Sequence, residues 1–364
     1  MISAFLHRAR ELHPALQWRI FVVLQLLLCW ISFDGVQDLP LDGDDLGFVT
    51  AAGSMLEGTV EIFSSGRTFS GRPVIELVFL GAYTLWGEEP APYHVLAVLL
   101  HFCAAMTISL ALERFGRPRI ESMLAGAFFL VGVGSFRVPH WVACIPYPIV
   151  LILGILATLA FSDYLKTRKT EKLILALLAI VIATFTHPSA VAFSLIGPAL
   201  VWLGRYPLRF FALPQSLFLL GGFVPFAMVW IFYGDAITAG GGSNAGQPLV
   251  VGSRMLAYLG YTSLTGHLLV YPSPEATDWR WLLIGIAVVC CGLLAWRWRL
   301  RTLVLCIGWS LLMVAPFSAT PQADLQSRHI YLAGVGPAVA VAFVLASLIR
   351  SKFEVRPLRS FVAI

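Results

Sequence analysis

The feature that most constrains this chain is a series of long apolar runs separated by short clusters of charge. Each run is about 16 to 22 residues long, close to the length that an α-helix needs to cross a bilayer. The chain is 58% hydrophobic and 12% charged over 364 residues, and its mean hydropathy is +0.81. A single soluble core could not hold this much apolar surface, so the sequence predicts an all-α, polytopic helical membrane protein.

We expect about ten transmembrane helices within one integral membrane domain that covers residues 1–364. The apolar runs are 18–33, 93–112, 122–136, 146–164, 173–187, 188–204, 214–233, 281–296, 302–317 and 329–349. A further apolar stretch, Pro73–Trp86, is ambiguous by length. As a helix it would rise about 21 Å, which is short of a hydrocarbon core of about 30 Å.

The distribution of charge decides the topology. If Pro73–Trp86 does not cross, one side of the membrane receives 19 of the 25 Lys and Arg residues, and the other receives 14 of the 20 Asp and Glu residues. Cytoplasmic loops carry an excess of Lys and Arg, so this partition predicts both termini in the cytoplasm. The net charge of +5 then reflects topology, and no nucleic-acid partner is expected. Six arginines remain on the predicted outer side: Arg67, Arg72, Arg137, Arg254, Arg280 and Arg328.

The predicted outer side also carries the long loops, at residues 34–92, 234–280 and 318–328, so we expect the working surface there. The first of them contains three carboxylates within four residues, Asp42-Gly43-Asp44-Asp45. Apolar residues at helical spacing follow, which predicts a helix along the membrane surface with Asp45 as a candidate cap. A second such helix is expected from Pro73, which suits a first helical position and leaves Arg72 just before it. Carboxylates and a guanidinium would then lie over one membrane-facing pocket.

Short motifs in the first third of the chain and near its C-terminal end resemble those of a known family. They are Arg72-Pro73-Val74, Leu85-Trp86-Gly87, Pro92-Tyr93-His94 and Leu100-His101 after the acidic cluster, and Ser327-Arg328-His329-Ile330-Tyr331-Leu332 near the other end. In this order they resemble the GT-C fold membrane glycosyltransferases. The likeness is greatest to the O-mannosyltransferases that carry tetratricopeptide repeats, and to their bacterial relatives. Those proteins carry an Arg-Pro-Leu, Leu-Trp-Gly, Tyr-His, Leu-His series and a Glu-Arg-Tyr-Leu-Tyr-Leu-Pro segment.

The resemblance implies an inverting transfer of a sugar from a polyprenyl-phosphate carrier to an acceptor on the outer side of the membrane. Such a reaction needs a base for the acceptor hydroxyl and cations for the leaving phosphate. By this resemblance Asp44 or Asp45 is the expected base, and Arg72 and Arg328 are the expected phosphate partners. The remaining expected substrate-binding residues are Asp42, His140, His329 and Tyr331. The expected location is a bacterial inner membrane, and the expected partners are the lipid-linked donor and membrane lipids.

Two departures from the family keep other functions open. Trp141 stands where the family's second outer loop carries an acid, and the tetratricopeptide repeats are absent. A catalytically degenerate relative that serves as a structural or assembly subunit of a larger membrane complex, with a protein partner, is therefore the alternative. A transporter of lipid-linked sugars is a third, although we find no inverted repeat to support it. The three carboxylates could also hold Mg²⁺ or Mn²⁺ through their oxygen atoms.

Several of these residues have plainer explanations. Asp42 to Asp45 could be a solvated turn with a helix cap. His94 and His101 are seven residues apart on one helix face, which suits buried, hydrogen-bonded histidines as well as a cavity lining. His187-Pro188 is expected to break a helix at the outer surface. A helix over about residues 250–270 suits lipid contact or ordinary packing.

Overall fold

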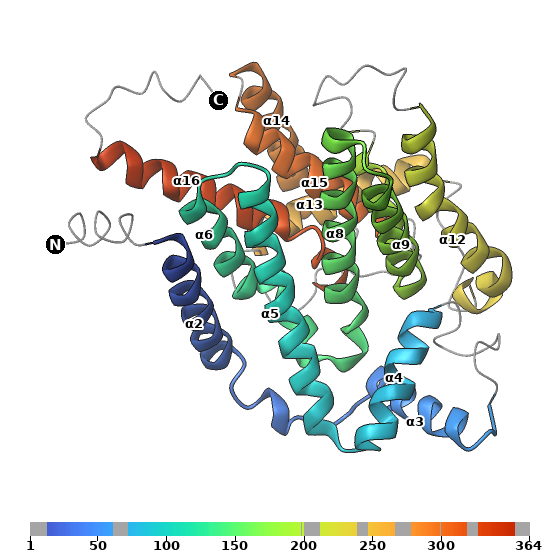
Figure 1. Ribbon diagram of the computed structural model, residues 1–364. Helices are drawn as coiled ribbons and strands as arrows, with labels where there is room; N and C mark the ends of the chain where they lie inside the picture. The colour runs from blue at the N-terminus through green and yellow to red at the C-terminus, as the bar shows by residue number, and fades with distance from the viewer. Residues whose placement is uncertain are drawn as a thin grey trace.

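The computed structural model describes residues 13–60, 72–197, 199, 212–238, 247–265, 278–298, 300–318 and 327–353. Within these ranges all the regular secondary structure is helical (Figure 1). The predicted all-α fold class is therefore confirmed.

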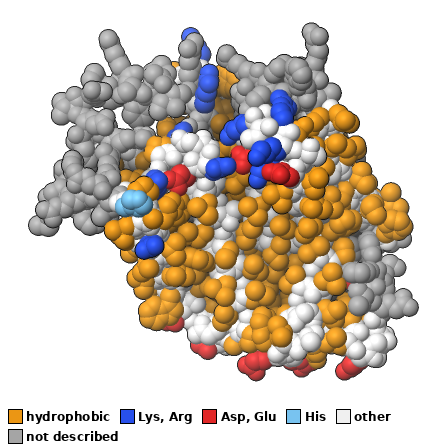
Figure 2. All heavy atoms as spheres, viewed as in Figure 1, with side chains coloured by type: hydrophobic (Ala, Val, Ile, Leu, Met, Phe, Trp, Pro, Cys, Tyr) orange, Lys and Arg blue, Asp and Glu red, His pale blue; other side chains and the backbone are white. Residues whose placement is uncertain are grey.

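Six helical segments are long and apolar enough to cross a membrane. They are α2 (Pro14–Ser32), α5 (Pro90–Arg114), η2 with α8 (Val142–Thr167), the Leu213–Phe232 part of α12 (Ala212–Thr238), α14 (Trp279–Arg297) and α15 (Arg301–Ser318). Apolar side chains cover the flank of the molecule in a broad band between its two ends (Figure 2). Water does not favour an apolar flank of this extent, and a bilayer does, so the chain is built as a membrane-embedded protein.

The predicted count of about ten crossings is not confirmed, because the other four runs form shorter or interrupted helices. These are α6 (Arg119–Leu130) followed by α7 (Val133–His140), α9 (Thr170–Thr186), η3 (Pro188–Ala190) with α10 (Val191–Ser194), and α16 (Val335–Phe353), whose apolar part is the shorter Val335–Ile349. A break at Val131 and Gly132 divides the run at 122–136. Most of the run at 188–204 lies outside the described residues.

The two helices expected in the first outer loop are present as α3 (Asp44–Leu56) and α4 (Pro73–Trp86), after a short turn, η1 (Val36–Asp38). Pro73 is the first residue of α4 and Arg72 precedes it, as predicted. The expected cap is different, because Gly43 is the N-cap of α3 and Asp45 lies inside its first turn. The helix expected over residues 250–270 is α13 (Pro248–Thr265), and residues 266–270 lie outside the described part.

Charge separates along the length of the molecule. In Figure 2 the Lys and Arg side chains gather near one end, and acidic side chains are spread along the opposite end, which in Figure 1 holds α3 and α4. At the basic end Glu113 accepts hydrogen bonds from Trp18 Nε1 (2.9 Å) and Arg119 Nε (2.6 Å), which join α2, α5 and α6. We call the opposite end the acidic end.

Two groups of buried apolar residues hold the bundle. The larger lies among α5, α6, α8, α9, α10, α15 and α16, and includes Phe129, Phe161 and Phe193. The smaller joins α3 and α4 to the start of α5 and to η2 (Val142–Cys144), with Phe48 stacked on Phe79 at a centroid distance of 4.7 Å. The smaller group fixes the acidic loop to the membrane-embedded bundle.

Close packing of α13 against α14 depends on two glycines. A Cβ atom on Gly285 would collide with the backbone carbonyl of Leu256, and one on Gly260 would collide with that of Trp281. Small residues at such a contact let two helix backbones approach within a membrane.

We expect Gly285→Ala to destabilise the protein by about 1–3 kcal/mol, because the added methyl group meets backbone that cannot rotate away. Thermal unfolding in detergent measures this. Gly252→Ala on α13 is the matched control, since its Cβ would meet open space and Ala is the better helix former. Equal unfolding temperatures for the two variants would contradict the close packing.

Candidate functional site at the acidic end

The first turn of α3 presents two neighbouring carboxylates in different environments. Gly43 takes a φ of +54°, a backbone conformation that suits glycine, and so turns the chain into the helix. Asp45 is 3% exposed, and its two oxygens accept hydrogen bonds from the backbone N–H groups of Ala143 (2.6 Å) and Val142 (3.2 Å). The side chain of Asp44 is 47% exposed, and its Oδ2 lies 3.6 Å from Arg328 Nη1. Asp45 therefore ties α3 to η2, while Asp44 faces the surroundings.

Burial dominates the titration of Asp45. It raises the pKa of this carboxyl group to about 7, although the hydrogen bonds from Ala143 and Val142 act in the opposite direction. The negative charges of Asp44 and Asp42 raise the pKa further. A carboxyl group that is close to half-protonated near neutral pH, and whose oxygens already accept two backbone bonds, is suited to holding structure.

This raised pKa predicts a pH dependence of stability. The folded protein keeps the Asp45 proton up to about pH 7, whereas the unfolded chain releases it near pH 4, so stability falls as the pH rises between these values. Asp45→Asn removes this titration and is expected to flatten the fall. Unfolding temperatures measured across this interval test it, with Asp44→Asn as the control that should keep most of the wild-type slope, because burial raises the pKa of Asp45 more than the charge of Asp44 does. An unchanged slope in Asp45→Asn would contradict the assignment.

Trp141 organises two guanidinium groups beside these acids. The Cζ atom of Arg137 lies 4.8 Å from the centroid of the Trp141 ring, and that of Arg328 lies 4.7 Å from it. Cation–π contact favours each arginine separately, but two like charges beside one ring repel each other. A bound anion would relieve this repulsion.

The segment that carries Arg328 is anchored by buried side chains. This segment is η6 (Ser327–Ile330) and the turn that follows it. The ring of His329 stacks on Phe317 at 4.5 Å, and its Nδ1 lies 2.9 Å from the hydroxyl group of Tyr258. Tyr331 lies 2.8 Å from His101 Nδ1. Since His101 Nε2 must donate to the carbonyl oxygen of Leu130 at 2.9 Å, the Tyr331 hydroxyl group donates to Nδ1. Arg328 is therefore held on a rigid support.

Four of the predicted site residues meet at this place: Asp44, Arg72, Arg328 and His329. Arg72 lies close enough to Asp44 and Arg328 for their charges to affect it. The charges that act on His329 come from Arg328, Arg254, Arg72 and Arg137. Four of the six arginines predicted on the outer side thus lie close enough to one imidazole for their charges to act on it, and we call these four arginines the arginine cluster.

The other predicted residues lie outside the arginine cluster. Tyr331 is fully buried, with its hydroxyl group directed to His101 in the interior. His140 packs on Phe136 and its Nδ1 lies 2.8 Å from the Phe136 carbonyl oxygen, within α7. Asp42 supplies a backbone carbonyl to the amide of Asp45. His94 and His101 are both buried, and His101 makes the hydrogen bonds that were expected, whereas neither ring nitrogen of His94 has a hydrogen-bond partner among the described residues.

Sequence reasoning missed Arg137, Arg254, Tyr147 and His187 as members of the site. The signal for the arginines was present, because an Arg on the acidic side of the predicted topology departs from the positive-inside pattern. His187 ends α9 before Pro188, as predicted. Its ring also lies 5.0 Å from the ring of Tyr147, and the charges of Arg72 and Arg328 act on it. Only the folded chain brings these residues together.

The predicted metal site has limited support from the geometry. Among the described residues no three His, Cys, Asp or Glu side chains form a group that could hold a metal ion. Both oxygens of Asp45 already accept backbone hydrogen bonds. Asp44 and Asp42 are the carboxylates left to bind a cation.

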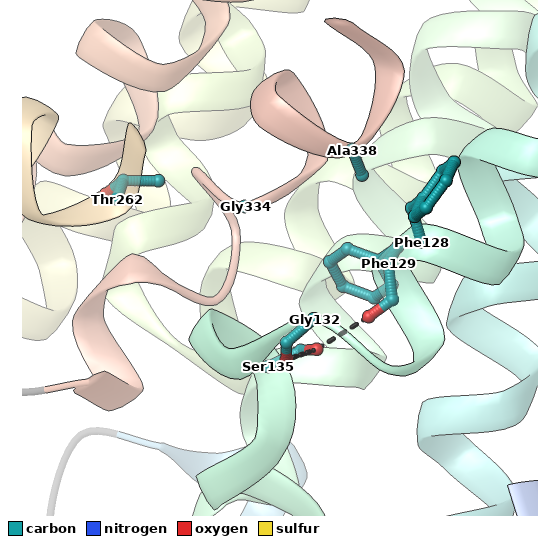
Figure 3. Close-up of a pocket in the computed structure, with 7 residues that line it drawn as sticks. All are labelled: Phe128, Phe129, Gly132, Ser135, Thr262, Gly334 and Ala338. Carbon is teal, nitrogen blue, oxygen red and sulfur yellow. Dashed lines mark hydrogen bonds between the residues drawn. The ribbon is translucent and has the colours of Figure 1, made fainter. Parts of the chain in front are cut away.

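A separate, narrow crevice lies between α6, α7, α13 and α16 and has room for about one water molecule. It is lined by Phe128, Phe129, Gly132, Ser135, Thr262, Gly334 and Ala338, and Ser135 donates a hydrogen bond to the carbonyl oxygen of Phe129 (Figure 3). The lining has no charged side chain. Its character is apolar, unlike that of the arginine cluster.

Comparison of the chain with protein-family models, curated proteins and solved structures finds no match. The chemistry of the site is therefore inferred from its own side chains.

Proposed function

We propose that the protein is a membrane glycosyltransferase that moves a sugar from a polyprenyl-phosphate donor to an acceptor at the acidic end, which faces outward. The observation that carries the proposal is the arginine cluster around His329, with Asp44 beside Arg328. Guanidinium groups suit the planar, bidentate recognition of phosphate oxygens. A carboxylate beside them suits the acceptance of a proton.

The reaction assigns a role to each group. An acceptor hydroxyl oxygen attacks the anomeric carbon, and the bond from that carbon to the phosphate oxygen breaks. The leaving polyprenyl phosphate keeps the electron pair and is stabilised by Arg72 and Arg328. Asp44 takes the hydroxyl proton, because it is the exposed carboxylate of the pair. The outcome is inversion at the anomeric carbon.

Location at a membrane surface supports this donor class. Arg328 contacts Asp44 at the start of α3, and α3 lies at the acidic end of the apolar bundle (Figure 1). A lipid carrier bound there would keep its chain in the bilayer and present its phosphate at the interface. The excess of Lys and Arg at the opposite, basic end of the molecule favours the acidic end as the outer one.

One observation favours a second candidate, a catalytically inactive subunit of a larger membrane complex. Asp45 is occupied by structural hydrogen bonds, and Trp141 stands where a second acid was expected. A structural subunit would use the same contacts to hold α3 against η2 and would bind a protein partner.

The test is transfer of radiolabelled sugar by the purified protein from a panel of polyprenyl-phosphate sugars. The proposal expects label to leave at least one donor, to an added acceptor or to water. Absence of turnover with every donor, together with copurification of a stoichiometric protein partner, would contradict it and favour the structural subunit.

A further inference from the structure

His187 connects the end of α9 to the arginine cluster, and its hydrogen bonds fix where its proton lies. The backbone N–H of Ser189 donates to His187 Nδ1 at 3.2 Å, and the Ser189 hydroxyl oxygen lies 2.8 Å from the same nitrogen. A backbone N–H can only donate, so Nδ1 is an acceptor. The proton of the neutral ring is therefore on Nε2.

The Nε2–H group of His187 makes no hydrogen bond with the described residues. The residue is only 8% exposed, and its ring lies between the rings of Tyr147 (5.0 Å) and Phe317 (6.0 Å). Because Nδ1 faces the turn at 188–190, Nε2 lies on the opposite edge of the ring. Nε2 is not among the buried side-chain atoms of the described residues that lack a partner, so this N–H is accessible and free to donate to a ligand.

The charged surroundings indicate which ligand would accept this bond. The charges that act on His187 come from Arg72, Arg328 and His329. Protonation of His187 would add a cation to this group and remove the acceptor that Ser189 uses. Burial and these neighbours accordingly lower the pKa of His187 well below its ordinary value. The ring is thus a neutral donor among guanidinium groups.

We propose that His187 is a further ligand of the phosphate group of the donor, through a hydrogen bond from Nε2–H to a phosphate oxygen. This inference rests on the proposed function, since it names a residue of the same site. A neutral donor adds a directional bond to the phosphate without adding to the repulsion between the arginines. The competing explanation is that His187 serves only to cap η3.

Two substitutions separate these roles. In His187→Asn the side-chain oxygen takes the place of Nδ1 and can accept from the Ser189 N–H, but nothing reaches the position of Nε2. In His187→Gln the side-chain amide N–H reaches the position of Nε2, and the acceptor for Ser189 is lost. Binding of a polyprenyl monophosphate is measured for both, with the corresponding polyprenol and inorganic phosphate as comparison ligands. Unfolding temperature is recorded for each.

We expect His187→Asn to keep the unfolding temperature and to bind polyprenyl phosphate about tenfold more weakly or worse. His187→Gln should lose thermal stability and keep more of the affinity. Polyprenol binding should not change in either variant. A similar loss of inorganic phosphate binding in His187→Asn would show that His187 contacts the phosphate group and not the lipid chain. Affinity that follows stability in both variants, or wild-type affinity in His187→Asn, would overturn the inference. If the wild-type protein does not prefer the phosphate to the polyprenol, the proposed function itself fails.

Discussion

Asp44→Asn is expected to lower the rate of sugar transfer by about a hundredfold to ten-thousandfold, the range that general base catalysis contributes. Asn has nearly the same shape as Asp and cannot take the acceptor proton at neutral pH. Donor affinity should stay close to that of wild type or rise, since Arg328 loses its carboxylate partner at 3.6 Å. Initial rates and donor binding, measured on the same preparations, test both parts.

Asp42→Asn is the matched control for Asp44→Asn. It removes one negative charge from the same loop, and the backbone carbonyl that Asp42 offers to the amide of Asp45 remains. We expect it to keep at least a tenth of the wild-type rate, because it changes only a neighbouring charge near the protein surface. Equal losses in the two variants would point to the charge of the loop and would remove Asp44 as the base.

Arg328→Met is expected to weaken donor binding by about ten- to a hundredfold. The loss corresponds to about 1.5–3 kcal/mol for hydrogen bonds between charged groups. Met keeps apolar contact with Trp141 and removes the charge. Arg328→Lys should recover part of the affinity, because a Lys ammonium group keeps the charge but lacks the planar fork. Equilibrium binding of a polyprenyl phosphate, measured at several salt concentrations, gives both values.

Arg280→Met provides the control for this experiment. Arg280 is also an arginine of the predicted outer side, but it pairs with Asp278 at 2.9 Å and its side chain is 72% exposed. Arg280→Met changes the net charge by the same amount as Arg328→Met. We expect it to weaken donor binding far less, because it removes none of the proposed contacts with the phosphate. If Arg280→Met weakened binding as much as Arg328→Met, general attraction between charges would explain the affinity, and the arginine cluster would have no specific role.

The elements predicted best are those whose cause is local in the sequence. Pro73 fixes the start of α4, and Pro188 ends α9, because the proline ring restricts the backbone on both sides. Apolar length predicted α2, α5, α8, α12, α14 and α15. The run at 122–136 was predicted as one span, yet it breaks at Gly132, where a following turn redirects the chain into α7. Hydropathy alone does not register such a break.

The candidate site could be predicted only in part, since its assembly depends on contacts between distant segments. The acidic cluster and the arginines of the outer side were visible as departures from the charge pattern. The sequence did not show that Asp45 is buried and structural while Asp44 is exposed. This difference depends on the backbone of Val142 and Ala143, about a hundred residues away. The place of Trp141 between Arg137 and Arg328 likewise follows from packing.

The central claim is that the arginine cluster receives the phosphate group of a lipid carrier. A structure of the protein with polyprenyl phosphate bound tests this most directly. The account predicts phosphate oxygens within about 3 Å of guanidinium nitrogens of Arg72 and Arg328, with the polyprenyl chain leading from there into the apolar band. A phosphate bound at the basic end of the bundle, or at the crevice beside Phe128, would contradict it.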